Sequence, residues 1–104
     1  MVNLIVLYPW PKDDKQFEGD YGSHLYLLHE KMGIPRDAKP YTITRFLHDT
    51  AEKPAYYQMF TLPFDSMEAL NAAMTSPAMQ EVAADANRIS TGGAPVILIG
   101  RERA

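Results

Sequence analysis

Cysteine is absent from this chain of 104 residues. Disulfides, thiolate nucleophiles and cysteine-based metal sites are therefore excluded, and a cytoplasmic location is expected. Long apolar runs are missing too, because the longest one, Leu4–Tyr8, is far shorter than the roughly 20 residues that span a bilayer. No signal peptide is expected either, since a strand-like run begins at Val2. We therefore expect no membrane association.

An excess of positive charge is also lacking. Lys and Arg number 10 against 13 Asp and Glu, which gives a net charge of −3 and a pI near 5.5. Nucleic acids and anionic membranes attract basic patches, so neither is an expected partner. Hydrophobic residues make up 46% and charged residues 22%, a composition typical of globular proteins. The length fits one domain over residues 1–104.

The first half of the chain predicts a strand followed by a helix. Val2–Tyr8 is a short apolar run that ends at Pro9. Asp13 or Asp14 can cap a helix that closes at Gly33. This helix has one buried face at helical spacing, formed by Phe17, Tyr21, His24, Leu25, Leu28 and Met32. Gly19 and Gly22 weaken the helix or let it approach a neighbour closely.

The second half predicts two more strands, a helical stretch and a last strand. The strands Tyr41–His48 and Ala55–Leu62 are separated by a polar connector, Asp49–Pro54, and Pro63 marks the end or the edge of the second one. Asp65 is predicted to cap the helical stretch, and Ser76-Pro77 to restart it. The final strand is Val96–Ile99. The order βαββαβ predicts an α+β, ferredoxin-like fold: a four-stranded antiparallel sheet with helices on one face.

The predicted strands are apolar on both sets of alternate positions, as in Leu4–Leu7 and Val96–Ile99. A sheet with one face in water alternates apolar and polar residues. Since helices cover only one face, the other face needs a partner, and a homodimer through the sheet faces is the simplest one. The alternative is a C-terminal segment folded over that face, for which Arg101–Ala104 is too short.

Four segments resemble the EthD family, named for proteins associated with bacterial degradation of ethyl tert-butyl ether. They are "NLIVLYPWP", "FEGDYGSHLYLL", the long stretch "PAYYQMFTLPFDSMEALNAAMTSPAMQEVAADANRISTGG" and the closing "VILIG". The resemblance implies a dimeric α+β barrel, a fold shared with cofactor-independent monooxygenases, muconolactone isomerase and haem-binding relatives. The sequence departs from the family pattern in three ways. Tyr26 stands where family members usually have proline, and the helix is one residue shorter between Phe17 and His24. Arg88 and Ile89 follow the asparagine where relatives often have an aromatic residue.

His24 is the leading candidate for chemistry. It lies on the apolar stripe of the first helix, where an imidazole can act as acid, base or ligand anchor; the resemblance supports this role. Tyr21, one turn earlier, can donate a hydrogen bond to a ligand oxygen. Both residues have a structural alternative, a buried core role. Further aromatic residues that can line a pocket for an apolar molecule are Tyr8, Trp10, Phe17, Tyr57 and Phe60.

Metal and nucleophile sites are not expected. His24 and His29 are five residues apart, which is not the spacing of a helical metal pair, and His29 and His48 are predicted to lie at the surface. Ser23 and His24 point about 100° apart on a helix, so no catalytic triad forms there. No metal or organic cofactor is implied.

Two functions remain open, besides a purely structural dimer whose inner sheet faces are the only functional surface. One is an enzyme that oxygenates, isomerises or cyclises an apolar, oxygenated or aromatic compound in a pocket between the first helix and the sheet, with His24 as the acid, base or anchor. The other is a non-catalytic binding or accessory protein of a degradation or stress-response pathway. A cavity of about 300 Å³ or more beside His24 favours chemistry on a ligand, and a closed core favours the accessory role.

Overall fold

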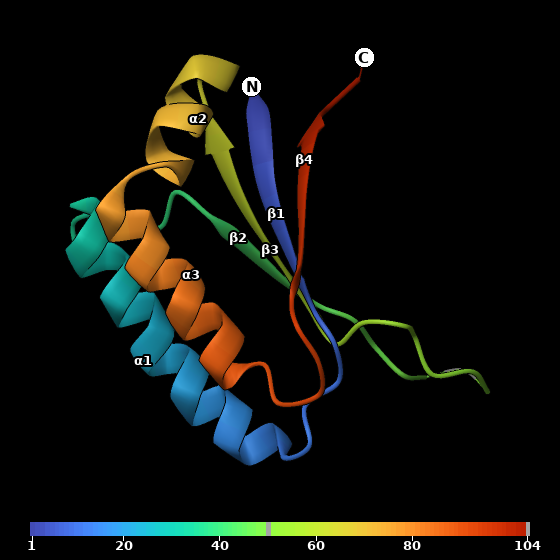
Figure 1. Ribbon diagram of the computed structural model, residues 1–104. Helices are drawn as coiled ribbons and strands as arrows, with labels where there is room; N and C mark the ends of the chain where they lie inside the picture. Colours follow the sequence, from blue (N-terminus) through green and yellow to red (C-terminus); the bar gives the residue numbers. More distant parts are fainter. Residues whose placement is uncertain (50, 104) are drawn as a thin grey trace.

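The computed structural model describes residues 1–49 and 51–103, which form one sheet covered by helices (Figure 1). The predicted order of elements is confirmed, and the second helical stretch is divided at Ser76. In chain order the elements are β1 (Val2–Tyr8), α1 (Asp14–Met32), β2 (Thr42–Arg45), β3 (Gln58–Phe64), α2 (Met67–Met74), α3 (Pro77–Ile89) and β4 (Val96–Arg101).

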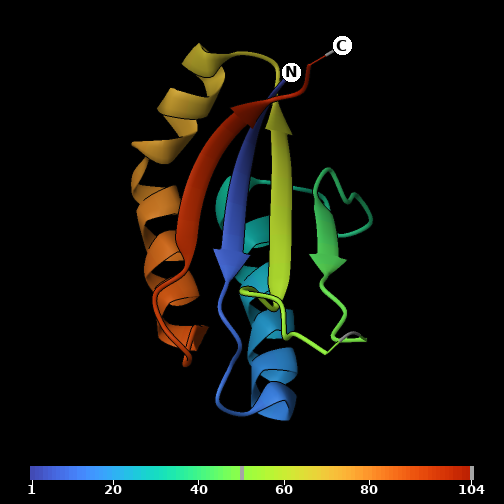
Figure 2. The same cartoon turned by 90° about the vertical axis from the view of Figure 1, so that its right-hand side faces the viewer.

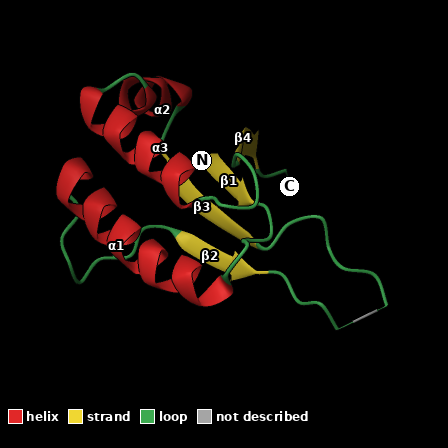
Figure 3. Cartoon of the chain, turned by 60° about the horizontal axis from the view of Figure 1, so that its bottom comes forward, coloured by secondary structure: helices red, strands yellow, loops and turns green. Residues whose placement is uncertain are grey.

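The four strands form an antiparallel sheet in the order β2-β3-β1-β4. Val6 of β1 stands opposite Phe60 of β3 and Ile97 of β4. The strands lie side by side in Figure 2, and Figure 3 shows the helices as a layer on one side of them. This is the predicted ferredoxin-like α+β arrangement, and in the single chain the sheet is open.

Three strand boundaries differ from the prediction. β2 covers only Thr42–Arg45, the four residues that pair with β3. β3 is shifted to Gln58–Phe64 and contains Pro63. Proline is tolerated there because the pairing of β3 with β2 stops at Thr61, so the residues of β3 after Thr61 have no neighbour on that side. β4 runs on to Arg101, opposite Val2. Thr50, in the predicted connector, lies outside the described residues.

Side-chain caps begin each helix. Asp13 accepts hydrogen bonds from the amides of Lys15 and Gln16 at the start of α1, as predicted. Gly33, at φ 66°, ends that helix in the left-handed conformation that glycine favours. The prediction that Asp65 caps α2 is wrong. Ser66 is the cap, because its Oγ accepts from the amide of Ala69 at 3.1 Å.

The glycines of α1 are not sites of close approach. A Cβ atom added at Gly19 or Gly22 would meet no neighbouring atom within 4 Å. Gly92, after α3, is the tight position, since a Cβ there would lie 1.7 Å from the carbonyl oxygen of Trp10. The loop before β4 therefore passes close to the backbone of the Pro9–Pro11 connector.

The core lies between the sheet and the helices. Along β1 the residues Val2, Leu4, Val6 and Tyr8 are buried, and the intervening ones are only partly covered. The opposite face of the sheet has no helix over it (Figure 3). The strand register places apolar side chains there from three strands, namely Ile5, Leu7, Met59, Val96 and Leu98. The predicted two-sided apolar character of the sheet is therefore present.

Candidate functional site

His24 lies at the contact between the two long helices. It belongs to the buried stripe of α1 and is 5% exposed. Its Nδ1–H donates to Oδ2 of Asp85 on α3, at 2.8 Å. Because a carboxylate only accepts, this bond selects the tautomer with hydrogen on Nδ1 and leaves Nε2 as an acceptor. Among the described residues, no hydrogen bond to Nε2 is present.

Asp85 is held from its other side by Arg88, one turn further along α3. The Arg88 Nε and Nη2 atoms both lie 2.9 Å from Oδ1 of Asp85. Burial alone would raise the pKa of Asp85, but the hydrogen bonds from His24 and Arg88 outweigh it, and the net shift is downward. The carboxylate thus stays charged and keeps the imidazole in one orientation.

Burial lowers the pKa of His24, and the hydrogen bond to Asp85 and its charge only partly oppose this effect. Arg88 adds a further small lowering. His24 is therefore neutral near pH 7, with a free basic nitrogen. This is the state that a general base or a hydrogen-bond acceptor needs.

An apolar cavity of about 50 Å³ lies beside His24, between the sheet and the helices. Tyr8 and His24 are its polar residues, and the other walls are Leu4, Val6, Phe60, Leu62, Met74, Met79, Val82, Ala83, Ala86 and Ile97. The helical part of the wall comes mainly from α2 and α3, whereas α1 contributes His24 alone. The pocket was expected between the first helix and the sheet, but the cavity lies closer to α3. The bulky buried side chains of α1 fill the space between that helix and the sheet.

The predicted site residues divide into two groups. Tyr8, Phe60 and His24 line the cavity, and Tyr21 lies behind them, stacked on His24 at 5.8 Å and edge-on to Tyr8 at 5.6 Å between ring centroids. Burial raises the pKa of both tyrosines, and the charge of Asp85 adds to the effect on Tyr8.

Trp10, Phe17 and Tyr57 lie outside the lining of this cavity. They contact one another edge to face, with Tyr57 at 5.0 Å from Trp10 and 5.6 Å from Phe17. The three rings pack together at the end of the sheet where the Pro9–Pro11 connector lies. The Trp10 indole donates to the carbonyl of Pro54 at 2.8 Å and so anchors the connector between β2 and β3.

Asp85 was not singled out from the sequence. The available signal was a carboxylate inside the apolar stripe of α3, between Val82 and Ala86, with Arg88 three residues later. That pattern is equally typical of a solvent-exposed salt bridge. Only the packing of α3 against α1 shows that the carboxylate meets His24.

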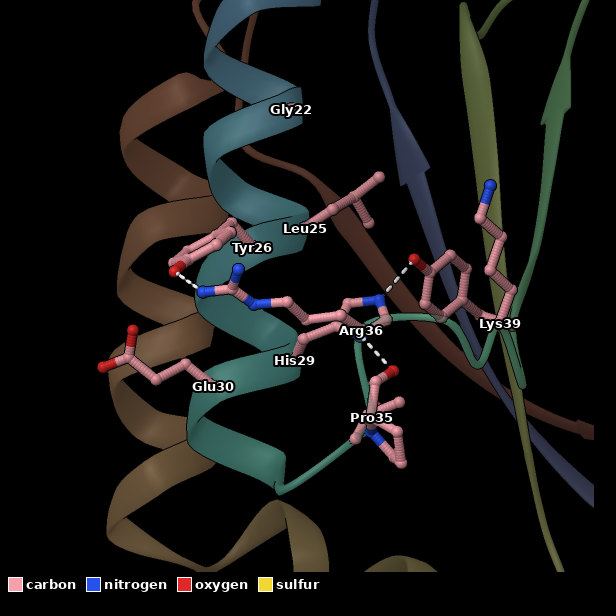
Figure 4. A pocket seen from close by; sticks show the side chains of 10 residues that line it. Gly22, Leu25, Tyr26, His29, Glu30, Pro35, Arg36 and Lys39 are labelled. Atoms are coloured by element: carbon pink, nitrogen blue, oxygen red, sulfur yellow. Dashed lines mark hydrogen bonds between the residues drawn. The ribbon is translucent and has the colours of Figure 1, made fainter.

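A second, open hollow of about 780 Å³ lies between α1 and the loop that leads to β2 (Figure 4). His29 forms part of its wall and ties the loop to the helix, with Nδ1 at 3.0 Å from the carbonyl oxygen of Pro35 and Nε2 at 2.7 Å from the hydroxyl of Tyr41. Arg36 donates to the hydroxyl of Tyr26. His29 is thus half-buried and bonded, whereas His48 is exposed as predicted.

Two further properties concern only the described residues. They contain no cluster of three or more His, Asp or Glu that could hold a metal ion. No helix among them is long and apolar enough to cross a membrane.

The fold and the buried His24–Asp85 pair define the chain as a ferredoxin-like α+β protein with a small cavity under its helices. It belongs to the EthD domain family, whose model matches residues 12–92. No curated protein matches the chain.

Solved structures agree with this assignment. An EthD family protein from Bacillus halodurans is 26% identical over 99% of both chains, with a TM-score of 0.81. A dimeric ferredoxin-like protein from Jannaschia is 12% identical over 97% of this chain and 98% of the other, with a TM-score of 0.69. A proposed antibiotic biosynthesis monooxygenase from Caulobacter crescentus is 20% identical over 99% of this chain and 89% of the other, with a TM-score of 0.57. The last two similarities concern the fold.

Proposed function

We propose that this protein binds a compact, largely apolar, oxygenated molecule beside His24 and that the Asp85–His24 pair acts on it as an acid–base group. The observation that carries the proposal is the hydrogen bond of 2.8 Å between Asp85 and the buried His24. It orients an imidazole whose second nitrogen has no partner among the described residues, next to an apolar cavity. A base held by an orienting carboxylate is a recurring catalytic arrangement.

The size of the cavity limits the ligand. About 50 Å³ is well below the roughly 300 Å³ of common ligand pockets, so the present shape admits only a very small molecule. Met74 and Met79 form part of the wall, and methionine side chains adapt readily to a ligand. Movement of these two side chains is the route by which a larger compound would enter.

The small volume is also the observation that favours a second candidate function, a binding or accessory protein without catalysis. The monooxygenase description of the Caulobacter relative favours the enzyme instead. Oxygenation, isomerisation and cyclisation all stay open as reactions. A role in a degradation pathway and a cytoplasmic location remain predictions.

We further propose that two copies pair through their open sheet faces into a dimeric barrel. The apolar residues of that face, Ile5 and Leu98 among them, support this assembly, as does the dimeric relative from Jannaschia. Pairing would remove these side chains from water without covering the cavity, which lies on the other side of the sheet.

Nuclear magnetic resonance with isotope-labelled histidine tests the binding site. The probes are compact oxygenated compounds, namely cyclopentanone, phenol and anisole. We expect at least one of them to shift the imidazole signals of His24, but not those of His48, and to bind more weakly to Asp85→Asn. If none of them affects His24 at millimolar concentration, the proposed site is wrong.

Turnover separates the two candidate functions. For any compound that is converted, His24→Ala should slow the reaction by about 10² to 10⁴, the usual contribution of a placed acid–base group. A loss below threefold would remove His24 from the mechanism. Binding without conversion would favour the non-catalytic role.

A further inference from the structure

Two buried polar atoms behind the cavity walls have no partner at ordinary hydrogen-bond distance among the described residues. They are the hydroxyl oxygen of Tyr21 and the amide nitrogen Nε2 of Gln58. The two residues are only 5% and 2% exposed. Native proteins satisfy the great majority of such groups, so a buried pair of unused polar atoms calls for a physical explanation.

Arg45 fixes the orientation of the Gln58 amide. Its Nη2 and Nε donate to Oε1 of Gln58 at 2.8 and 3.3 Å. A flipped amide would set its NH₂ group against the guanidinium, donor against donor. Arg45 is itself held, because it pairs with Glu18 and lies 4.1 Å above the ring of Tyr57. The NH₂ group of Gln58 therefore faces inward.

The hydroxyl of Tyr21 lies close to this amide group. Burial is the main influence on the pKa of Tyr21 and raises it, while a long side-chain hydrogen bond from Gln58 acts in the opposite direction. The Gln58 nitrogen can only donate, so it can stabilise the Tyr21 oxygen but cannot accept the hydroxyl proton. That proton is left to be donated elsewhere.

The neighbours of both residues are cavity walls. Gln58 stands directly opposite Tyr8 in the sheet and shares a face with Phe60. Tyr21 contacts the rings of Tyr8 and His24. All three of these neighbours line the cavity. A ligand that enlarges the cavity at this end would meet the Tyr21 and Gln58 donors.

We propose that Gln58, held by Arg45, is a positioning residue that makes Tyr21 a hydrogen-bond donor toward the cavity, and that the pair selects ligands carrying a carbonyl oxygen. This inference rests on the proposed function, since it assumes a ligand beside His24. A carbonyl oxygen only accepts hydrogen bonds and so complements a site with unused donors. A hydrocarbon of the same shape leaves those donors unsatisfied.

Cyclopentanone and methylenecyclopentane test this selectivity, because they differ only in C=O against C=CH₂. Their dissociation constants are measured by titration, with the side-chain amide signals of Gln58 recorded in ¹H–¹⁵N spectra. We expect the ketone to shift these signals. Tyr21→Phe and Gln58→Met should each lower the preference for the ketone by about threefold to tenfold, the value of one hydrogen bond. Gln16→Met, on the exposed start of α1, should leave it unchanged.

The outcomes distinguish this inference from the proposed function. One outcome is that the ketone shifts the His24 signals while wild type and Tyr21→Phe prefer the ketone over the hydrocarbon equally. The selectivity role is then overturned and the binding site stands. If neither probe perturbs His24 or Gln58, this inference fails, and the proposed function fails with it when phenol and anisole also leave His24 unchanged. Should Gln58→Met not fold, Tyr21→Phe decides the question alone, because it removes only the hydroxyl group.

Discussion

His24 belongs to the core and to the candidate site at once. Its place on the apolar stripe of α1 could be predicted, because helical spacing puts it in line with Tyr21 and Leu28. Its partner could not be predicted, since Asp85 lies 61 residues away along the chain. The spacing of residues on one helix says nothing about which residue of another helix meets them.

The lowered pKa of His24 predicts a loss of stability in acid. The unfolded chain binds the proton near pH 6.5, whereas the folded state, in which burial opposes the charge, binds it only at lower pH. The free energy of unfolding therefore keeps its full value above pH 6.5 and decreases as the pH falls below it. Each unit by which folding lowers the pKa of His24 makes this decrease in the free energy of unfolding about 1.4 kcal/mol larger. Asp85, whose pKa is also lowered, adds a second loss below its ordinary value near 3.8.

Urea unfolding at pH 7.5 and 5.5, at one protein concentration, measures this effect. The decrease in the free energy of unfolding should be smaller in His24→Gln than in wild type. His48→Gln, which changes an exposed histidine, should behave as wild type. An equal decrease in all three proteins would contradict the prediction.

Tyr21 and Tyr41 allow a comparison of how much a tyrosine hydroxyl contributes to the free energy of unfolding. The Tyr21 hydroxyl has no partner at ordinary hydrogen-bond distance, so Tyr21→Phe should lower the free energy of unfolding by less than Tyr41→Phe does. The Tyr41 hydroxyl bonds to His29 at 2.7 Å, so Tyr41→Phe should cost about 1 kcal/mol. Denaturant titration of both variants checks this. A loss in Tyr21→Phe as large as that in Tyr41→Phe would mean that its hydroxyl is bonded after all.

At the scale of elements, short-range chemistry decides most boundaries. Gly33 ends α1, and Ser76 with Pro77 starts α3, as predicted, because both signals act within one turn. The error at α2 arose from two adjacent capping residues, Asp65 and Ser66. The backbone direction at the end of β3 chooses between them, and that direction depends on the sheet.

Substitution of each candidate cap tests this choice. Ser66→Ala should lower the free energy of unfolding by about 1 kcal/mol, because the amide of Ala69 loses its acceptor. Asp65→Ala should change it by less than about 0.5 kcal/mol, as at ordinary surface positions. Thermal or urea unfolding measures both variants, and the reverse ranking would restore Asp65 as the cap.

The glycines give opposite expectations in a helix and in a loop. Gly19→Ala should stabilise the protein by about 0.5 to 1 kcal/mol, because alanine favours the helix and nothing within 4 Å obstructs its Cβ. Gly92→Ala should destabilise it by about 1 to 3 kcal/mol, since the added methyl collides with the carbonyl of Trp10. Unfolding curves of the two variants should therefore shift in opposite directions.

At the scale of the whole molecule, the main feature is the open face of the sheet, whose apolar side chains no helix covers. Leu98 of β4 is 46% exposed and stands beside Ile5 on the face without helices. An apolar sheet face of this kind is unusual in a monomer. Burial against a second copy would cover it and close the two open sheets together.

Analytical ultracentrifugation tests the dimer directly. The wild-type protein should sediment as a dimer of 11.7 kDa chains, and Leu98→Lys should shift it toward the monomer, because a charge would be buried at the interface. Leu47→Lys is the control, since Leu47 lies outside the sheet and is 71% exposed. A folded wild-type monomer in dilute solution would remove the barrel assembly.

The sequence by itself determined the order of elements, the helix face that carries His24 and the two-sided apolar sheet. These properties follow from residue spacing and local backbone preference. Only the tertiary structure decided that Asp85 meets His24, that the cavity lies under α3, and that Trp10, Phe17 and Tyr57 pack on one another. Those facts depend on contacts between residues far apart in the chain, and such contacts are set by how side-chain volumes fill the space between layers.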